Sequence, residues 1–251
     1  FAKLAKATTP LADGVDPDRV GVTDTKITVT PAEYGLAVGR TSLASLQTGG
    51  KADLGVSAVV ALNMAETLNA VGIIAGEAGT NILIANSVAT EGALTATDLI
   101  TKGDLNYIHN RLSRANILKF EGDMYVALCH PDVASDIKEL EDFKDAHTYG
   151  NNITLIKNEL GSYKGFRWVE SSGVTTNTDA GSGTVDTYHT QFMGRNAMGR
   201  GVSKDPTLVI SGPFDSLGRI LNIGWLATLQ YKIVDQNAHW IITSASSYGS
   251  N

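Results

Sequence analysis

The residue pair with the clearest chemical potential in this 251-residue sequence is Cys129 followed directly by His130. A thiol and an imidazole form a nucleophile–base pair in some hydrolases, provided that their side chains meet. Cys129 ends a short apolar run at 124–129, which is typical of a buried strand. Since neighbouring strand residues point to opposite faces, the sequence favours a buried structural cysteine over a nucleophile.

The five histidines show no metal-binding pattern. No two of them have the i, i+4 spacing of a helical zinc site, and no cysteine cluster accompanies them. Asn177, Asp179 and Asp186 superficially resemble a calcium loop, but the terminal glutamate and the alternation of ligands are missing. We therefore predict no metal and no cofactor, and interpret 171–187, which is poor in hydrophobic residues, as the solvated tip of a mobile hairpin.

Two kinds of segment remain as candidates for chemistry. Residues 194–201 are glycine-rich and basic but lack the Gly-Lys-Ser/Thr ending of a phosphate-binding loop, so a turn or interface loop is expected. Carboxylates gather at Asp16 and Asp18 and again from Glu139 to Asp142. Paired acids support hydrolysis or proton transfer only when a fold brings them together in a cleft. We predict no catalytic residue.

Composition limits the partners of the chain. The net charge is −6, and the Lys and Arg residues are scattered along the sequence. The chain therefore lacks the stripe of basic residues that is typical of proteins that bind DNA tightly. The most apolar stretch, Leu54 to Ala65, is too short to span a bilayer, and no signal or transit peptide is visible. Because the chain begins with Phe1 and not with methionine, we expect its natural start upstream, removed by processing or not part of this sequence.

The strongest element signal is a helix over 53–74. Leu54, Ala58, Leu62 and further apolar or small residues recur at three- and four-residue spacing, which predicts an apolar stripe. About 22 residues at ~1.5 Å each make a rod of roughly 33 Å, which is long for a compact domain of this size.

The other expected elements alternate without a βαβ rhythm, so the fold class is α+β. Residues 1–24 are loop-like because prolines and glycines interrupt any regular period. The expected elements are an extended segment at 26–38, helices at 101–115 and 132–143, and strands at 124–129, 166–169, 225–234 and 238–243.

Six stretches, taken in order, resemble the major capsid proteins of tailed bacteriophages, in particular the subfamily typified by the coat protein of coliphage N-four. No single stretch is a catalytic fingerprint, and the specificity lies in the ordered set. The stretches are LAKATTPLADGVDPD (4–18), ITVTPAEYGLAVGRTSL (27–43), MYVALCHPDVASDIKE (124–139), FKDAHTYG (143–150), NELGSYKGFRWVES (158–171) and IGWLATLQYKIVD (223–235).

This resemblance implies the Hong Kong 97-type capsid fold, with an extended E-loop, a peripheral domain and an axial domain. Residues 1–24 would be the returning part of the E-loop, and 25–100 the peripheral domain with 53–74 as its spine helix. Residues 101–222 would build most of the axial domain, and 223–251 would return to the peripheral sheet.

The implied function is a structural one, not an enzymatic one. Copies of the chain would form the pentamers and hexamers of an icosahedral head around double-stranded DNA, without binding that DNA strongly. Decoration, scaffolding and portal proteins are further expected partners, no membrane is involved, and assembly in the host cytoplasm would yield the virion. The E-loop residues Leu4, Pro10, Leu11 and Val15 are expected on a neighbouring subunit.

Two alternatives remain open at this point. The first is an encapsulin-like nanocompartment, which shares the fold but encloses a cargo protein. The second is a hydrolytic enzyme that uses the acids near Glu139 and Asp142. The size of the particle and its contents separate these alternatives from a phage head.

Overall fold

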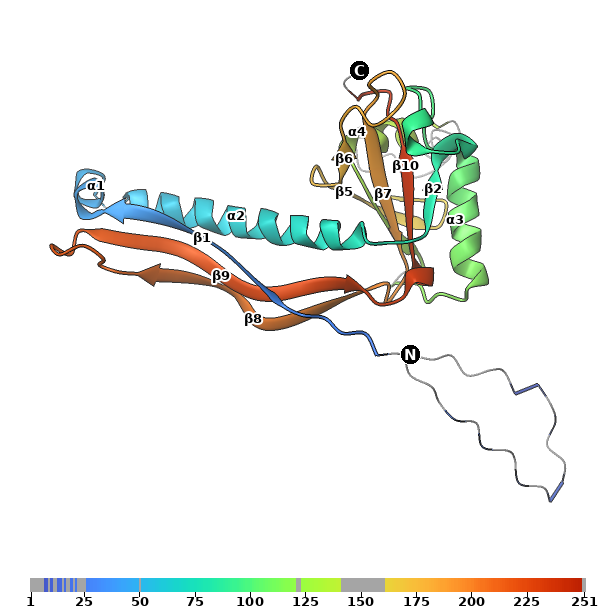
Figure 1. Ribbon diagram of the computed structural model, residues 1–251, viewed down its shortest axis with the longest axis horizontal. Helices are drawn as coiled ribbons and strands as arrows, with labels where there is room; N and C mark the ends of the chain where they lie inside the picture. Colours follow the sequence, from blue (N-terminus) through green and yellow to red (C-terminus); the bar gives the residue numbers. More distant parts are fainter. Residues whose placement is uncertain are drawn as a thin grey trace.

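The computed structural model describes residues 7, 8, 10, 13, 14, 16, 19, 21, 26–49, 51–120, 123–140 and 161–249. This part of the chain has two bodies, a slender arm and a compact lobe (Figure 1). We define the arm as residues 32–76 and 198–233. The lobe comprises the described residues of 82–193 together with 239–249, and short segments at 77–81, 194–197 and 234–238 connect it to the arm.

The arm is a long helix lying on a narrow antiparallel sheet. Helix α2 (Lys51–Gly76) has 26 residues, which corresponds to about 39 Å. The sheet has the order β1-β9-β8, so the last of its strands in sequence lies in the middle. Its strands are β1 (Ala32–Thr41), β8 (Met198–Ser211) and β9 (Ile220–Ile233), and the short helix α1 (Ser42–Gln47) joins β1 to α2.

One row of side chains holds α2 to the central strand. Val60 is buried against Trp225, Ala227 and Leu229, which alternate along β9 and therefore share one face of the sheet. Val56, Met64, Leu68, Tyr34 and Tyr231 pack around this cluster while half-exposed. The arm thus has a core only one helix wide.

The lobe is built on a mixed seven-stranded sheet. Its hydrogen-bonded order is β2-β10-β7-β3-β5-β4, and β6 pairs with β7. The strands are β2 (Ile82–Ile84), β3 (Tyr125–Cys129), β4 (Ser162–Tyr163), β5 (Phe166–Glu170), β6 (Thr176–Asn177), β7 (Thr187–Met193) and β10 (His239–Ser244). Short 3-10 turns occur at η1 (Ala85–Ser87), η2 (Glu91–Ala93) and η3 (Gln236–Ala238).

Two helices bury the aromatic face of this sheet. Phe192 of β7, Phe166 and Trp168 of β5 and Tyr125 of β3 form one cluster with the apolar faces of α3 (Lys102–Arg114) and α4 (Pro131–Glu139). Because side chains alternate along a strand, His189 and Gln191 of β7 point to the opposite face. The end of α2 meets that opposite face.

Local signals explain where both helices begin. Thr101 caps α3 in a capping box, in which its hydroxyl accepts from the backbone N–H of Asp104 and the Asp104 carboxylate accepts from the backbone of Thr101. Pro131 occupies the first turn of α4, where a missing N–H costs nothing.

The structure confirms the α+β class and several expected elements. The helix expected at 53–74 is α2, the helix at 101–115 is α3, and strands form at 124–129 and 166–169. The helix expected at 132–143 begins as predicted, and its expected last residues lie outside the described part of the chain.

The strand pairing divides the chain at different residues from the peripheral and axial domain ranges expected from the resemblance. Residues 82–100 lie with the lobe, since β2 pairs with β10, and β10 itself belongs to the lobe. Residues 198–211 form β8 of the arm. Strand β8 was not predicted from the sequence, because register shifts around Lys204 and Pro206 interrupt the alternation of inward and outward side chains along it.

Candidate assembly surface

The predicted structural role of Cys129 is confirmed. Its thiol is buried under α4 and lies 3.8 Å from the carbonyl oxygen of Val169. Burial, together with the charge of Glu170, raises the pKa of Cys129 to about 12, so the thiol stays protonated at neutral pH. The neighbouring His130 points elsewhere and lies 3.1 Å from the Asp132 carboxylate. The two side chains therefore do not form a nucleophile–base pair.

The interpretation of 171–187 as a solvated hairpin tip fits its exposed residues, such as 182–184, but is wrong for the residues that are buried or hydrogen-bonded in the lobe. Asp186 is buried and accepts a hydrogen bond of 3.0 Å from the backbone N–H of Asp179. Asn177 donates to Glu91 at 2.8 Å, and Val174 is buried. Asn177 looked solvent-bound in sequence because its partner Glu91 is distant along the chain. Among the described residues, no three His, Cys, Asp or Glu side chains are grouped to hold a metal ion.

The other predicted sites have mixed outcomes. The expected turn at 194–201 is present at its start, where the Ala197 N–H donates to Gly194 at 3.1 Å, but Met198 already begins β8. Of the expected E-loop contacts, Pro10 is exposed. Leu4, Leu11, Val15 and Asp142 lie outside the described residues.

The outward face of α2 is apolar and uncovered. Leu62 and Val59 are exposed, as are Ala58 and Ala65, and of these Leu62, Ala58 and Ala65 belong to the apolar stripe expected from the sequence. The helix is apolar around most of its circumference, so its sequence period could not identify the side that packs on β9. This uncovered face is the first part of a surface that a partner can bury.

The sheet extends the apolar surface on both flanks of α2. Leu36 and Val38 of β1 pair across from β9 residues whose side chains face the helix, so they lie on the same side of the sheet as α2. Leu208 and Ile210 of β8 occupy the equivalent positions on the other flank. All four are exposed because one helix is too narrow to cover three strands.

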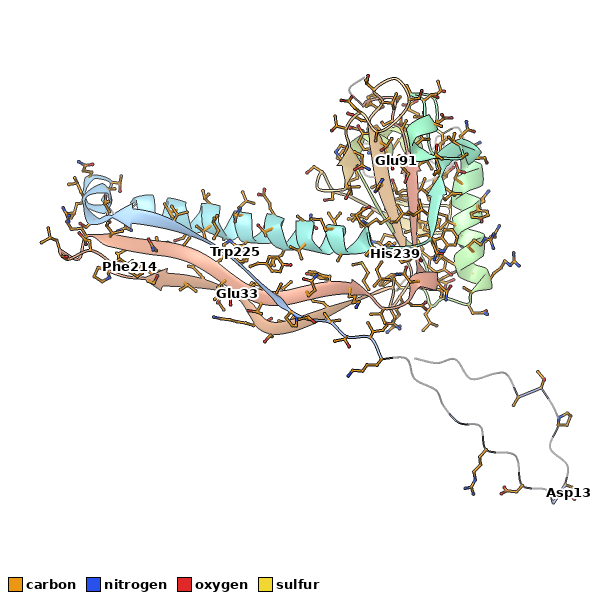
Figure 2. All side chains as sticks on the ribbon, viewed as in Figure 1. Asp13, Glu33, Glu91, Phe214, Trp225 and His239 are labelled. Carbon is orange, nitrogen blue, oxygen red and sulfur yellow. The ribbon has the colours of Figure 1, made fainter. Side chains whose placement is uncertain are left out.

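The far end of the arm carries the most exposed large apolar residues. Leu46 of α1 is 79% exposed, and Leu217 in the loop between β8 and β9 is 73% exposed. Phe214 from the same loop is also exposed, and Figure 2 shows it at the end of the arm remote from the lobe. Large apolar side chains gathered on one surface mark an interaction site.

The loop between β8 and β9 is held in shape by one carboxylate. Asp215 accepts from the backbone N–H of Arg219 and, at 2.8 Å, from its guanidinium Nε. The backbone N–H of Ile220 donates to the same carboxylate at 3.3 Å. These hydrogen bonds lower the pKa of Asp215. The turn therefore presents Phe214 and Leu217 outward without having to reorganise when a partner binds.

The two edges of the arm sheet differ. β8 has register shifts around Lys204 and Pro206, and such irregularities and charges protect an edge strand from pairing. The middle of β1, residues 34–39, contains neither charge nor proline. The β1 edge is consequently the more open to a further strand.

Segment Gly55–Gly76 of α2 is long and apolar enough to cross a membrane by length and composition alone, and little of it is fully buried. The sequence expectation considered 54–65 alone, and the structural helix is longer. Its packing on β9 through Val60, together with the exposed carboxylate of Glu66, fits a helix that lies on a sheet. The apolar composition is explained if another protein surface covers the outward face.

No protein-family model and no curated protein sequence matches this chain. Solved structures do match. The capsid asymmetric unit of cyanophage Pam1 aligns with a TM-score of 0.64 at 14% identity, over 98% of this chain and 83% of that one. The acidic stable capsid of Helicobacter pylori bacteriophage KHP30 aligns with a TM-score of 0.63 at 13% identity, over 86% and 75%. The capsid of Ralstonia phage GP4 gives 0.59 at 14% identity, over 86% and 73%. The chain thus has the fold of tailed-phage capsid proteins, the Hong Kong 97-type fold that the sequence resemblance implied.

Proposed function

We propose that this chain is the major capsid protein of a tailed bacteriophage, which assembles with copies of itself into pentamers and hexamers of an icosahedral head. The observation that carries the proposal is an uncovered apolar surface along the arm of a chain with a capsid fold. Such a surface is costly in water and becomes favourable when neighbouring subunits bury it.

The geometry suits repeated lateral contacts. Each fully buried Leu or Phe contributes about 1.5–3 kcal/mol, so burial of Leu46, Phe214 and Leu217 alone gives several kcal/mol per subunit. In a closed symmetric assembly the same contact recurs at every copy. Many moderate contacts therefore stabilise a shell without any one of them being tight. The role is structural and requires no catalytic residue.

The two bodies correspond, in this proposal, to the two domains of a capsid subunit. The arm with α2 is the peripheral domain, and the lobe is the axial domain at the centre of a pentamer or hexamer. Residues 1–24 are the returning part of the E-loop, with Leu4, Pro10, Leu11 and Val15 placed on an adjacent subunit. This assignment moves β8 from the axial to the peripheral domain, because β8 pairs with β9.

Charge and resemblance define the remaining partners. A net charge of −6 disfavours tight attachment of packaged DNA to the inner wall, which is compatible with its later release. The ordered sequence stretches support the N-four-type subfamily. We place the protein in the virion after assembly in the bacterial cytoplasm, with decoration, scaffolding and portal proteins as additional partners.

Electron microscopy and size-exclusion chromatography of the purified chain test the proposal. We expect particles in the megadalton range with icosahedral symmetry. A small oligomer with hydrolytic activity that depends on Glu139 would overturn it. Particles that enclose a cargo protein in infected or producing cells, and no phage DNA, would instead identify an encapsulin-like compartment.

A deletion of residues 1–24 tests the role assigned to the E-loop segment. The deleted chain should remain folded, since the arm and lobe cores are made by other residues, and it should fail to close shells. Normal shells from the deleted chain would contradict the placement of Leu4, Pro10, Leu11 and Val15 on a neighbour.

A further inference from the structure

The arm joins the lobe where α2 ends, against the polar face of the lobe sheet. The chain passes between the two bodies at 77–81, 194–197 and 234–238. Gln191 of β7 reaches across this junction, and its amide donates to the carbonyl of Ile73 in the last turn of α2 at 3.0 Å. A Cβ on Gly76 would collide with the same amide, so the helix end approaches β7 as closely as a glycine permits.

One histidine at this junction lies between two carboxylates from different elements. His189 Nδ1 is 2.5 Å from Oε2 of Glu77, which directly follows α2. His189 Nε2 is 3.4 Å from Oε1 of Glu91 in η2. Protonated imidazole can donate from both nitrogens at once, so it can bridge the base of the arm and the lobe. We call Glu77, His189 and Glu91 the junction triad.

Neutral side chains fix both carboxylates in place. Glu77 accepts a second hydrogen bond of 2.8 Å from Gln191. Glu91 accepts from Asn177 at 2.8 Å and from the Thr187 hydroxyl at 2.5 Å. The carboxylates are therefore oriented by neighbours before the imidazole binds them, which favours charged hydrogen bonds.

The electrostatics of the triad favour its fully charged form. Burial alone would lower the pKa of His189, but the hydrogen bonds and charges of Glu77 and Glu91 outweigh burial and raise it. Burial would likewise raise the pKa of Glu77 and of Glu91. Hydrogen bonds and the charge of His189 outweigh burial and lower both carboxyl pKa values. Glu77 accepts from His189 and Gln191, and Glu91 accepts from Thr187 and Asn177. The other titratable group facing Glu77 is His239 of β10, which is buried and neutral at physiological pH.

We propose that the junction triad is a positioning lock that holds the base of α2 tightly to the lobe while His189 is protonated and loosens when that proton is lost. Loss of the proton leaves two neighbouring carboxylates with one neutral ring between them. A neutral imidazole donates from a single nitrogen, so Nδ1 can still donate to Glu77 while Nε2 accepts from Asn177, whose Nδ2 lies 3.3 Å away. The bridge to Glu91 and the charge attraction to both carboxylates are lost, which loosens the base of α2. The lock belongs to the isolated subunit and does not depend on the proposed shell.

The sign of the pH dependence follows from the directions of the shifts. A raised His189 pKa gives stabilisation that is complete below its ordinary value of about 6.5 and is lost as pH rises through the raised value. Lowered Glu77 and Glu91 pKa values give stabilisation that is complete above their ordinary values and is lost as pH falls through the lowered ones. The lock is therefore fully closed between about pH 4.5 and 6.5, loosens as pH rises through the raised His189 pKa, and loosens again as pH falls through the lowered Glu77 and Glu91 pKa values.

Hydrogen–deuterium exchange of the full chain, kept unassembled by dilution, tests the lock. Above the His189 pKa, amides at 73–79 should exchange roughly ten- to hundredfold faster, relative to intrinsic rates, than at pH 6. Amides of β3 in the lobe centre should not change. In His189→Gln, residues 73–79 should exchange fast at both pH values, and the pH dependence should disappear.

His130→Gln is the matched control, since His130 also pairs with a carboxylate in the lobe but stacks on Tyr188, on the sheet face opposite His189. It should preserve the pH dependence at 73–79. If His189→Gln does not fold, Glu91→Gln keeps the Glu77 contact and should lower the His189 midpoint in an NMR titration. An unchanged midpoint in Glu91→Gln, or pH-dependent exchange that survives in His189→Gln, would overturn the proposal. Neither measurement requires an assembled shell, so a negative result here does not contradict the assembly proposal. A failure of the chain to assemble would likewise not contradict the lock.

Discussion

The indole nitrogen of Trp225 donates a hydrogen bond of 3.0 Å to the side-chain oxygen of Asn63, which fixes the middle of α2 to the centre of β9. A helix that is apolar around most of its circumference could rotate on an apolar sheet with little loss of burial. A directional bond from a buried indole distinguishes one rotation from the others. The outward face of α2 is thereby also defined.

Trp225→Phe should therefore weaken the arm more than its small loss of volume suggests. The aromatic ring stays in the cluster with Val60, but the half-buried Asn63 oxygen loses its protein donor, which costs about 0.5–1.5 kcal/mol. Urea denaturation measures the loss, and hydrogen exchange should locate it in α2. Trp240→Phe, which alters a lobe residue, should leave exchange in α2 unchanged. Unaltered stability of the Trp225→Phe arm would contradict the role given to this bond.

Leu217→Asp should block assembly without unfolding the subunit. Leu217 is 73% exposed in the subunit, so a charge there costs little until a neighbour covers it. Loss of about 1.5–3 kcal/mol per contact corresponds to a tenfold or greater rise in the concentration needed for assembly. Light scattering across a concentration series measures that threshold.

Ser216→Asp provides the control for this experiment, because it places the same charge at the neighbouring exposed position. It should raise the threshold much less than Leu217→Asp. Equal effects of the two variants would show that charge, and not apolar contact, governs the tip of the arm.

His239 should make the lobe sensitive to acid. Its ring is buried, neither nitrogen has a hydrogen-bond partner among the described residues, and burial lowers its pKa to about 4. The unfolded chain takes up the proton near pH 6.5, so stability falls from pH 6.5 down to about 4, by about 3 kcal/mol in all. Thermal denaturation should show this slope, and His239→Leu should flatten it. A slope that persists in His239→Leu would assign it to other groups.

Cys129 should resist thiol reagents in the folded protein. The thiol is buried and its pKa is raised to about 12, so almost no thiolate exists at pH 8. Reaction with a disulfide reagent should be at least a hundredfold slower than in urea-unfolded chain. Rapid labelling under native conditions would show that α4 opens readily. Cys129→Ala should cost about 1–2 kcal/mol through the cavity that it leaves.

Sequence reasoning succeeded where the determinants are local. The spacing of Leu105, Ile108 and Leu112 predicts α3 and its buried face, and Thr101 and Asp104 lie three residues apart at its start. The same reasoning identified α2, but its apolar stripe did not mark the buried side: Leu68 packs against the Val60 cluster, whereas Ala58 and Leu62 are exposed. When a helix has no polar side, its sequence period does not show which of its faces will pack against the rest of the protein.

The rest of the candidate sites could not be predicted, because their partners are far apart in the chain. Glu77 and His189 are separated by 112 positions, and no local pattern connects them. β8 was missed because its register shifts break the two-residue alternation, and the exposed tip with Phe214 and Leu217 was missed with it. A signal existed in the sequence, since two large apolar residues within a short turn bounded by glycines are unusual.

The position of β9 at the centre of the arm sheet sets the order of events at the ribosome. β1 is synthesised early, but its partner β9 begins about 180 residues later, a delay of roughly ten to thirty-five seconds at bacterial translation rates. Until then α2 and β1 have no sheet to lie on, and no finished surface exists for another copy to recognise. In the proposed assembly, a nascent chain therefore offers no finished arm surface to another copy until β9 has been synthesised.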